Sequence, residues 1–183
     1  MELKGKKIAF LGDSITEGAG VSDKSNIFWN ILGQQTGAQV YGYGIGGTRI
    51  ARQHKPSACA RWDLDFISRV DSMIDDADIV VVFGGTNDFG HGDAPFGVMS
   101  DRTNDTFYGA LHVLYQKLCQ RYPSAQIVVM TPPPPQQRGR DRPERAGRPS
   151  GRKTGGLCGG HPASSGGLLH SCVGFVPCQR HPA

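Results

Sequence analysis

The sequence predicts an α/β fold in which a parallel sheet is covered by helices on both faces. Short apolar runs at residues 7–12, 39–43, 79–83 and 126–130 are typical of buried strands. Stretches with helical spacing of apolar residues lie between them. This alternation of strand and helix along the chain is typical of parallel sheets covered on both sides.

The clearest of these strands is the run Ile-Val-Val-Val-Phe at residues 79–83. It is rich in β-branched residues and is closed by Gly84 and Gly85. The run at 7–12 is also apolar and also ends in glycine. In a sheet of this class the chemistry gathers at the carboxyl ends of the strands, so we expect a functional site there.

Two apolar stripes predict the covering helices. Because such stripes usually pack against a sheet, we expect core packing for both and not a ligand surface. The first stripe consists of Trp62, Phe66, Val70 and Ile74, and the second of Phe107, Leu111, Leu114, Tyr115 and Leu118.

Composition divides the chain after residue 131. Residues 1–131 carry 12 Lys and Arg against 14 Asp and Glu, and we expect them to form one incomplete α/β domain. Residues 132–183 carry 8 basic and 2 acidic residues together with 10 Gly and 9 Pro. This composition predicts an irregular tail, with the last elements of the sheet missing or replaced by it.

The sequence contains no membrane or export signal. No run approaches the roughly 18 apolar residues of a membrane helix, and the first residues lack the apolar stretch of a signal peptide. We therefore expect a cytoplasmic protein without a membrane span. Neither a P-loop nor a GxGxxG pattern is present, and we expect no cofactor.

Residues suited to acyl transfer follow three of the predicted strands. Ser14 comes after the first strand, Gly44 after the second and Asn87 after the third. Each is explained alone by a helix cap or a turn. Together they offer a hydroxyl nucleophile, a backbone N–H and a side-chain amide, which are the parts of an oxyanion hole.

These residues resemble the first three signature blocks of the SGNH hydrolases, also called GDSL esterases/lipases. The blocks are Gly-Asp-Ser at 12–14, Gly44, and Gly-Thr-Asn-Asp at 85–88, and the resemblance covers about residues 5–131. It implies a flavodoxin-like three-layer α/β/α fold and hydrolysis of a small-molecule ester or acylated substrate. It further implies that Ser14 is the nucleophile and supplies one oxyanion N–H, Gly44 a second N–H, and the Asn87 side chain the third donor.

The fourth block of that family, Asp-x-x-His near the C-terminus, is absent after residue 131. Its histidine is the general base, without which a serine is a poor nucleophile. The pattern occurs only at residues 88–91, inside the third block, and we interpret this match as a coincidence. We expect His91 to lie at the rim of the pocket and not to act as the base. The alternative function is therefore a catalytically inactive α/β binding module that keeps the pocket.

Three hypotheses address the tail. A shifted reading frame would explain the composition of the tail. With suitable synonymous codons, the nucleotides that encode residues 157–182 can also be read in another frame, as an amphipathic helix followed by a strand. Two Cys-x-x-His units at 158–161 and 178–181 could supply four zinc ligands. The basic residues could contact nucleic acid. Little apolar sequence separates the two Cys-x-x-His units, so we expect no metal. No aromatic residues lie between the basic residues, so we expect no nucleic-acid partner.

Overall fold

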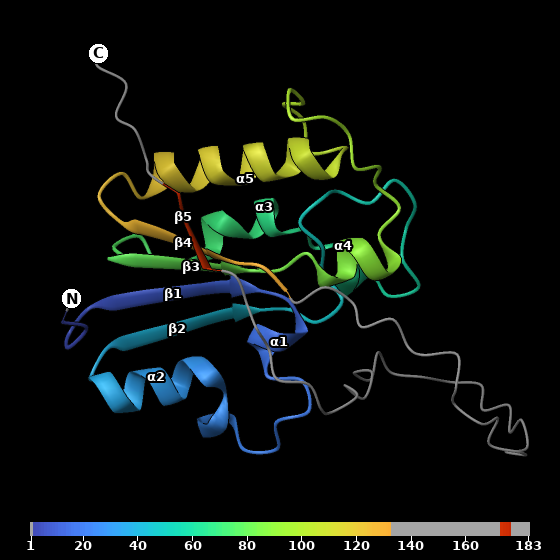
Figure 1. The fold of residues 1–183 in the computed structure, drawn as a ribbon. Coiled ribbons are helices and arrows are strands. Elements are labelled where there is room, and N and C mark those ends of the chain that lie inside the picture. Colours follow the sequence, from blue (N-terminus) through green and yellow to red (C-terminus); the bar gives the residue numbers. More distant parts are fainter. Residues whose placement is uncertain (1, 133–172, 177–183) are drawn as a thin grey trace, which may run out of the picture.

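A computed structural model describes residues 2–132 and 173–176 of the 183-residue chain (Figure 1). Strands and helices alternate along it, as predicted. The elements are, in order, β1 (Lys7–Gly12), α1 (Ser14–Glu17), η1 (Lys24–Asn26), α2 (Phe28–Thr36), β2 (Gln39–Gly44), η2 (Ala60–Asp63), α3 (Phe66–Arg69), η3 (Val70–Ser72), β3 (Ile79–Phe83), α4 (Thr86–His91), α5 (Phe107–Arg121), β4 (Gln126–Met130) and β5 (Val173–Val176).

The five strands form one sheet in the order β2-β1-β3-β4-β5. The first four are parallel, and this confirms the predicted α/β class. The order β2-β1-β3-β4 is the one found in flavodoxin-like folds, in which ligands bind where the strand order reverses. Gly12, at the end of β1, is in register with Gly44 of β2 and Phe83 of β3, so these strand ends lie side by side.

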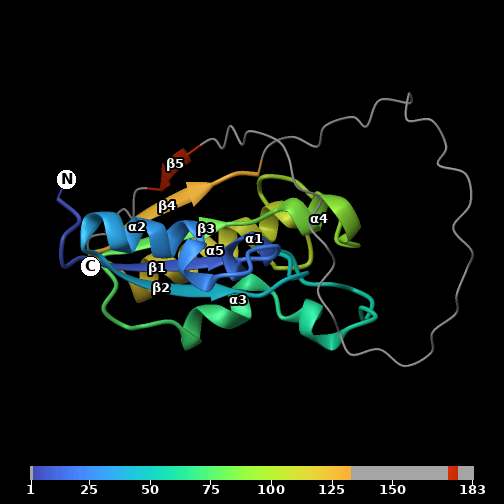
Figure 2. The same ribbon diagram turned by 90° about the horizontal axis from the view of Figure 1, so that it is seen from below.

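Strand β5 differs from the expectation for the tail. Residues 173–176 pair antiparallel with β4, from Ile127 opposite Val176 to Met130 opposite Val173. They occupy the outer edge of the sheet, beyond β4 in Figure 2, where we expected irregular chain. The pairing satisfies backbone groups that an edge strand leaves open. The two Cys-x-x-His units lie outside the described residues. Apart from residues 173–176, so does the segment that the frame-shift hypothesis concerns.

Helices cover both faces of the sheet, with α3 and α5 on one side and α2 on the other (Figure 1). Residues of β3 alternate between the two cores, because successive side chains of a strand point to opposite faces. Val80 and Val82 belong to the larger core under α3 and α5, and Ile79 and Val81 to the smaller core under α2. A strand buried on both faces explains the unbroken apolar run in the sequence.

The stripe from residue 62 to residue 74 forms three short helical pieces, η2, α3 and η3, in place of one helix. The break has a local cause: Asp65 has an extended backbone, and its carboxylate accepts a hydrogen bond of 2.7 Å from the Ser68 N–H. Such a cap starts a new helix. Phe66 and Val70 are fully buried, as predicted. Trp62, in contrast, is only half-buried and is not part of this core.

Candidate active site

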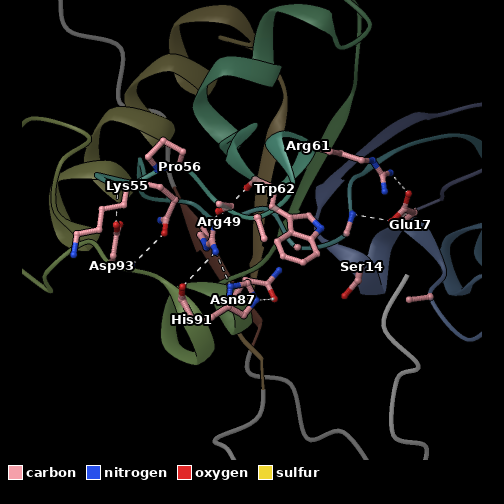
Figure 3. A pocket seen from close by; sticks show the side chains of 16 residues that line it. Ser14, Glu17, Arg49, Lys55, Pro56, Arg61, Trp62, Asn87, His91 and Asp93 are labelled. Atoms are coloured by element: carbon pink, nitrogen blue, oxygen red, sulfur yellow. Dashed lines mark hydrogen bonds and ion pairs between the residues drawn. The ribbon is translucent and has the colours of Figure 1, made fainter. Parts of the chain in front are cut away.

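A cavity of about 700 Å³ opens at the carboxyl ends of β1, β2 and β3 (Figure 3). This is the edge at which the sequence predicts the site. Ser14 and Asn87 both line the cavity. Trp62, predicted to be a core residue, also lines it. Five charged side chains complete this part of the wall: Glu17, Arg49, Lys55, Arg61 and Asp93.

Ser14 is held at the cavity because it is the first residue of the short helix α1. Asp13 caps this helix, and its Oδ1 accepts a hydrogen bond of 3.0 Å from the Ile15 N–H. Gly18 ends the helix after four residues with φ of 84°, a left-handed backbone that favours glycine. The serine hydroxyl therefore follows directly on a strand and stands at the start of a helix, as the sequence predicts.

The carboxyl group of Asp13 is almost fully buried, with 1% of its surface exposed. Burial is the main cause that raises its pKa to about 6, and the nearby charge of Asp88 raises it further. The Ile15 N–H and the cation of Arg69 act in the opposite direction. The Oδ2 atom makes no hydrogen bond within the described residues. A charge at this position therefore costs folding free energy at neutral pH.

Gly44 and Gly46 play different parts in the structure. A Cβ on Gly44 would overlap the backbone nitrogen of Glu17, so this glycine allows β2 to pack closely against α1. Gly44 is not among the residues that line the cavity, whereas Gly46 is. A Cβ on Gly46 would lie 3.5 Å from the Cβ of Ser14. Glycine stands at three of the four positions 44–47, which allows a close backbone approach, but the sequence alone does not say which glycine makes it.

The Gly46 N–H donates a hydrogen bond of 2.7 Å to Glu17 Oε2. Glu17 also forms an ion pair with Arg61, from the far wall of the cavity. The carboxylate thus joins the loop after β2 to the 3₁₀-helix η2. Glu17 and Arg61 were not predicted, because their contacts link segments far apart in the sequence.

Asn87 is the second residue of α4, which begins after Gly85 with φ of 108°. Its Nδ2 donates a hydrogen bond of 2.8 Å to the carbonyl oxygen of Thr48. Its Oδ1 lies 3.1 Å from Nε2 of His91, one turn later on the same helix. The amide is therefore held from both ends at the wall of the cavity.

Asp88 docks the loop after β2 onto α4. Its carboxylate accepts hydrogen bonds from the N–H groups of Ile50, at 3.0 and 3.1 Å, and Ala51, at 2.9 Å. Burial raises its pKa, and the two N–H donors act against that rise. Two consecutive residues of α4 thus bind residues 48–51, and the two segments fix one another.

Arg49 crosses the cavity wall and is buried, with 4% of its surface exposed. One guanidinium nitrogen donates to Ser57 Oγ at 2.8 Å and lies 3.5 Å from a carboxylate oxygen of Asp63. The other lies 2.7 Å from Nδ1 of His91. The side chain therefore ties the loop around η2 to α4, and Figure 3 shows it beside His91 and Asn87.

A second buried cation, Arg69, lies behind the strand ends. It donates to the carbonyl oxygens of Gly12, at 3.2 Å, and Tyr43, at 2.7 Å, and to Thr48 Oγ1 at 3.1 Å. Burial is the main cause that lowers its pKa to about 10, so it stays charged at neutral pH. One side chain thus holds the ends of β1 and β2 and the following loop together.

The described histidines do not reach Ser14 through their hydrogen bonds. His91 contacts Arg49 and Asn87, and His54 contacts the carbonyl oxygen of Asp105. His112 lies exposed on α5. The remaining histidines of the chain lie outside the described residues. Among the described residues, no histidine is hydrogen-bonded to Ser14.

Residues 2–132 and 173–176 contain no group of three or more His, Cys, Asp or Glu that could hold a metal ion. Over the same residues no helix is long and apolar enough to cross a bilayer. The polar groups that line the cavity include the Ser14 hydroxyl, the Asn87 amide, the His91 imidazole and charged side chains.

Solved structures with a similar fold were found, whereas no curated protein matched the sequence. One structure is 35% identical with a TM-score of 0.61, and the match covers 72% of this chain and 58% of that one. A protein from Lactobacillus plantarum is 30% identical with a TM-score of 0.58, covering 70% and 56%. This chain thus spans less than two thirds of the length of either.

A third structure, a provisionally named GDSL-like lipase from Bacteroides uniformis, is 25% identical with a TM-score of 0.59, and the match covers 68% of this chain and 70% of that one. A profile of the GDSL-like Lipase/Acylhydrolase family matches residues 10–152. This match covers more than half of the chain and confirms the resemblance found in the signature blocks. The chain belongs to the GDSL-like lipase/acylhydrolase family.

Proposed function

We propose that this chain is a serine-dependent acyl hydrolase that acts on a small-molecule ester or acylated substrate. The observation that carries the proposal is the convergence of Ser14 and Asn87 on one cavity, from the ends of two adjacent strands. Membership of a lipase/acylhydrolase family supports the same reaction class. Ser14 Oγ would attack the acyl carbonyl, and the bond to the alcohol would break as the alcohol leaves with the proton that Oγ gives up. Water would then release the acid from the acyl-serine, while the cavity binds the rest of the substrate.

The oxyanion that forms in this attack needs hydrogen-bond donors already in place. We assign three: the N–H of Ser14, the Nδ2–H of Asn87 and a backbone N–H from the glycine run after β2. The family resemblance implies Gly44 for the last donor. Because Gly44 packs against α1 and does not line the cavity, whereas Gly46 does, we assign this donor to Gly46 instead. For Gly46 to serve, the Glu17 carboxylate must give up its hydrogen bond to that N–H.

Labelling with an activated phosphonate ester tests the proposal. Such a reagent phosphonylates an activated serine and leaves a mass increase that intact-protein mass spectrometry detects. We expect stoichiometric labelling of the full chain, no labelling of Ser14→Ala, and full labelling of Ser25→Ala as a matched control at an exposed serine. Labelling that persists in Ser14→Ala would refute the assignment of the nucleophile.

A second function, that of a catalytically inactive binding module, is favoured by one observation: no described histidine hydrogen-bonds Ser14. A folded chain that binds phosphonate or ester ligands reversibly, yet never becomes labelled at Ser14, would support this function over hydrolysis. Calorimetric titration with a non-hydrolysable ester analogue measures such binding directly.

A further inference from the structure

Asn87 and His91 lie four residues apart on α4, which places their side chains on the same face of the helix. Arg49 reaches this pair from the loop after β2. We propose that Arg49 and His91 are positioning residues that fix the orientation of the Asn87 amide for binding the oxyanion. This inference rests on the proposed function for the role of Asn87, but not for the geometry.

The protonation pattern of His91 follows from its partners. The guanidinium of Arg49 can only donate hydrogen bonds, so Nδ1 of His91, at 2.7 Å, must accept and carries no proton. In a neutral imidazole the proton is then on Nε2. Nε2 is the atom that faces Asn87 Oδ1 at 3.1 Å, and it donates to that oxygen. The buried arginine therefore selects one tautomer of the histidine.

That tautomer in turn fixes the Asn87 amide. Its oxygen faces the His91 N–H, and one of its two Nδ2 hydrogens is bound by the Thr48 carbonyl oxygen at 2.8 Å. Turning the amide over would bring two donors together at His91 and two acceptors together at Thr48. The arrangement leaves the second Nδ2–H for an acceptor in the cavity, which Asn87 lines. An oxyanion is such an acceptor.

The same contacts argue against His91 as a replacement for the missing general base. A base for Ser14 needs an unprotonated ring nitrogen directed at the hydroxyl. In His91 the unprotonated nitrogen faces Arg49, and the protonated one faces Asn87. Because Arg49 is held in turn by Ser57 and by the carboxylate of Asp63, the ring has polar partners on both edges.

The tautomer can be measured in the unmodified chain. Long-range ¹H–¹⁵N spectra of the imidazole rings distinguish Nε2–H, Nδ1–H and doubly protonated histidine. At pH 7.5 we expect the His91 ring to show the Nε2–H pattern, with its signals assigned by their loss in His91→Gln. An Nδ1–H or doubly protonated ring would overturn the proposal, and this measurement needs no reactive serine.

Two variants test the effect on Asn87. His91→Leu removes both hydrogen bonds, whereas His91→Gln keeps an acceptor for Arg49 and an N–H for Asn87. We expect the side-chain ¹⁵NH₂ signals of Asn87, assigned by their loss in Asn87→Ala, to broaden or double in His91→Leu and to stay single in His91→Gln. Phosphonate labelling of Ser14 should slow about 10- to 100-fold in His91→Leu, which is no more than the effect of losing one oxyanion donor. In His91→Gln, which keeps the hydrogen bonds, the labelling rate should stay within about threefold of that of the unmodified chain.

The outcomes separate the proposal from the proposed function. Unchanged Asn87 signals in a folded His91→Leu would refute the positioning role, whatever happens to labelling. Equal loss of labelling in both variants with unchanged Asn87 signals would instead identify His91 as the general base. If the unmodified chain is never labelled but the Asn87 signals respond as expected, the positioning role holds and the hydrolase proposal fails.

Discussion

Replacing Asp13 by Asn should change how the stability of the protein depends on pH. The carboxyl group has a pKa of 3.8 in an ordinary environment and of about 6 in the folded protein, chiefly because it is buried. A folded state that holds its proton more tightly than the unfolded state loses stability as pH rises between these two values. The penalty is absent below about pH 4 and complete above about pH 7. The Asp13→Asn variant carries no such penalty, because a side-chain amide does not ionise in this range.

The size of the penalty follows from the shift in pKa. One pKa unit corresponds to about 1.4 kcal/mol, so a rise from 3.8 to about 6 corresponds to about 3 kcal/mol. Asn keeps the oxygen that accepts the Ile15 N–H, and Asn and Asp cap helices about equally well. The buried amide nitrogen adds a cost that does not vary with pH. The stability difference between Asp13→Asn and the unmodified chain should therefore rise by about 3 kcal/mol from pH 4 to pH 8.

Urea unfolding followed by circular dichroism at pH 4, 5, 6, 7 and 8 measures this difference. Asp23→Asn is the matched control, because Asp23 caps η1 in the same way through a hydrogen bond of 2.9 Å to the Ser25 N–H. Its carboxylate is exposed and that N–H lowers its pKa below 3.8, so the stability difference between Asp23→Asn and the unmodified chain changes below about pH 4 and should stay nearly constant from pH 4 to pH 8. A pH-independent difference for Asp13→Asn, or the same slope in both variants, would refute the reasoning.

Three further predictions concern the site and its packing. Removing the Asn87 amide (Asn87→Ala) should slow phosphonate labelling of Ser14 by about 10²- to 10³-fold, the cost of one oxyanion donor, and a change confined to reagent affinity would contradict this. Turnover of p-nitrophenyl acetate by the unmodified chain should exceed that of Ser14→Ala, because Ser14 supplies the nucleophile, and equal turnover of the two would support the inactive binding module instead. In thermal unfolding, Gly44→Ala should destabilise the fold by about 1–3 kcal/mol, because the added Cβ would overlap the backbone of Glu17. Gly90→Ala is the control and should be neutral or stabilising, because a Cβ at that position meets no atom within 4 Å.

The central strand β3 could be predicted because a strand buried on both faces is apolar at every position. Val80 and Val82 face one core while Ile79 and Val81 face the other, so every position is apolar. The strand at 173–176 could not be predicted in the same way. It pairs at the edge of the sheet with β4, more than forty residues earlier in the chain, and only its short apolar run Val-Gly-Phe-Val hinted at it.

The site was predictable where function leaves a local pattern, and not where it depends on distant contacts. Ser14 and Asn87 stand at the ends of recognisable strands, and the structure brings both to the cavity. The pairing of Arg49 with His91 joins residues 42 apart, and nothing in the spacing of the sequence signals it. The role of Arg69 behind the strand ends was equally invisible, because an arginine on a short helix is usually exposed.

The mutual docking of residues 48–51 and α4 limits how this site can be altered or transplanted. Thr48 binds Asn87, Arg49 binds His91, and Ile50 binds Asp88, so each segment supplies partners that the other needs. A chimera that exchanges one segment alone would leave buried polar groups without partners on both sides of the seam. The smallest unit that can be moved into a related scaffold, or diversified in a library, is therefore the two segments together.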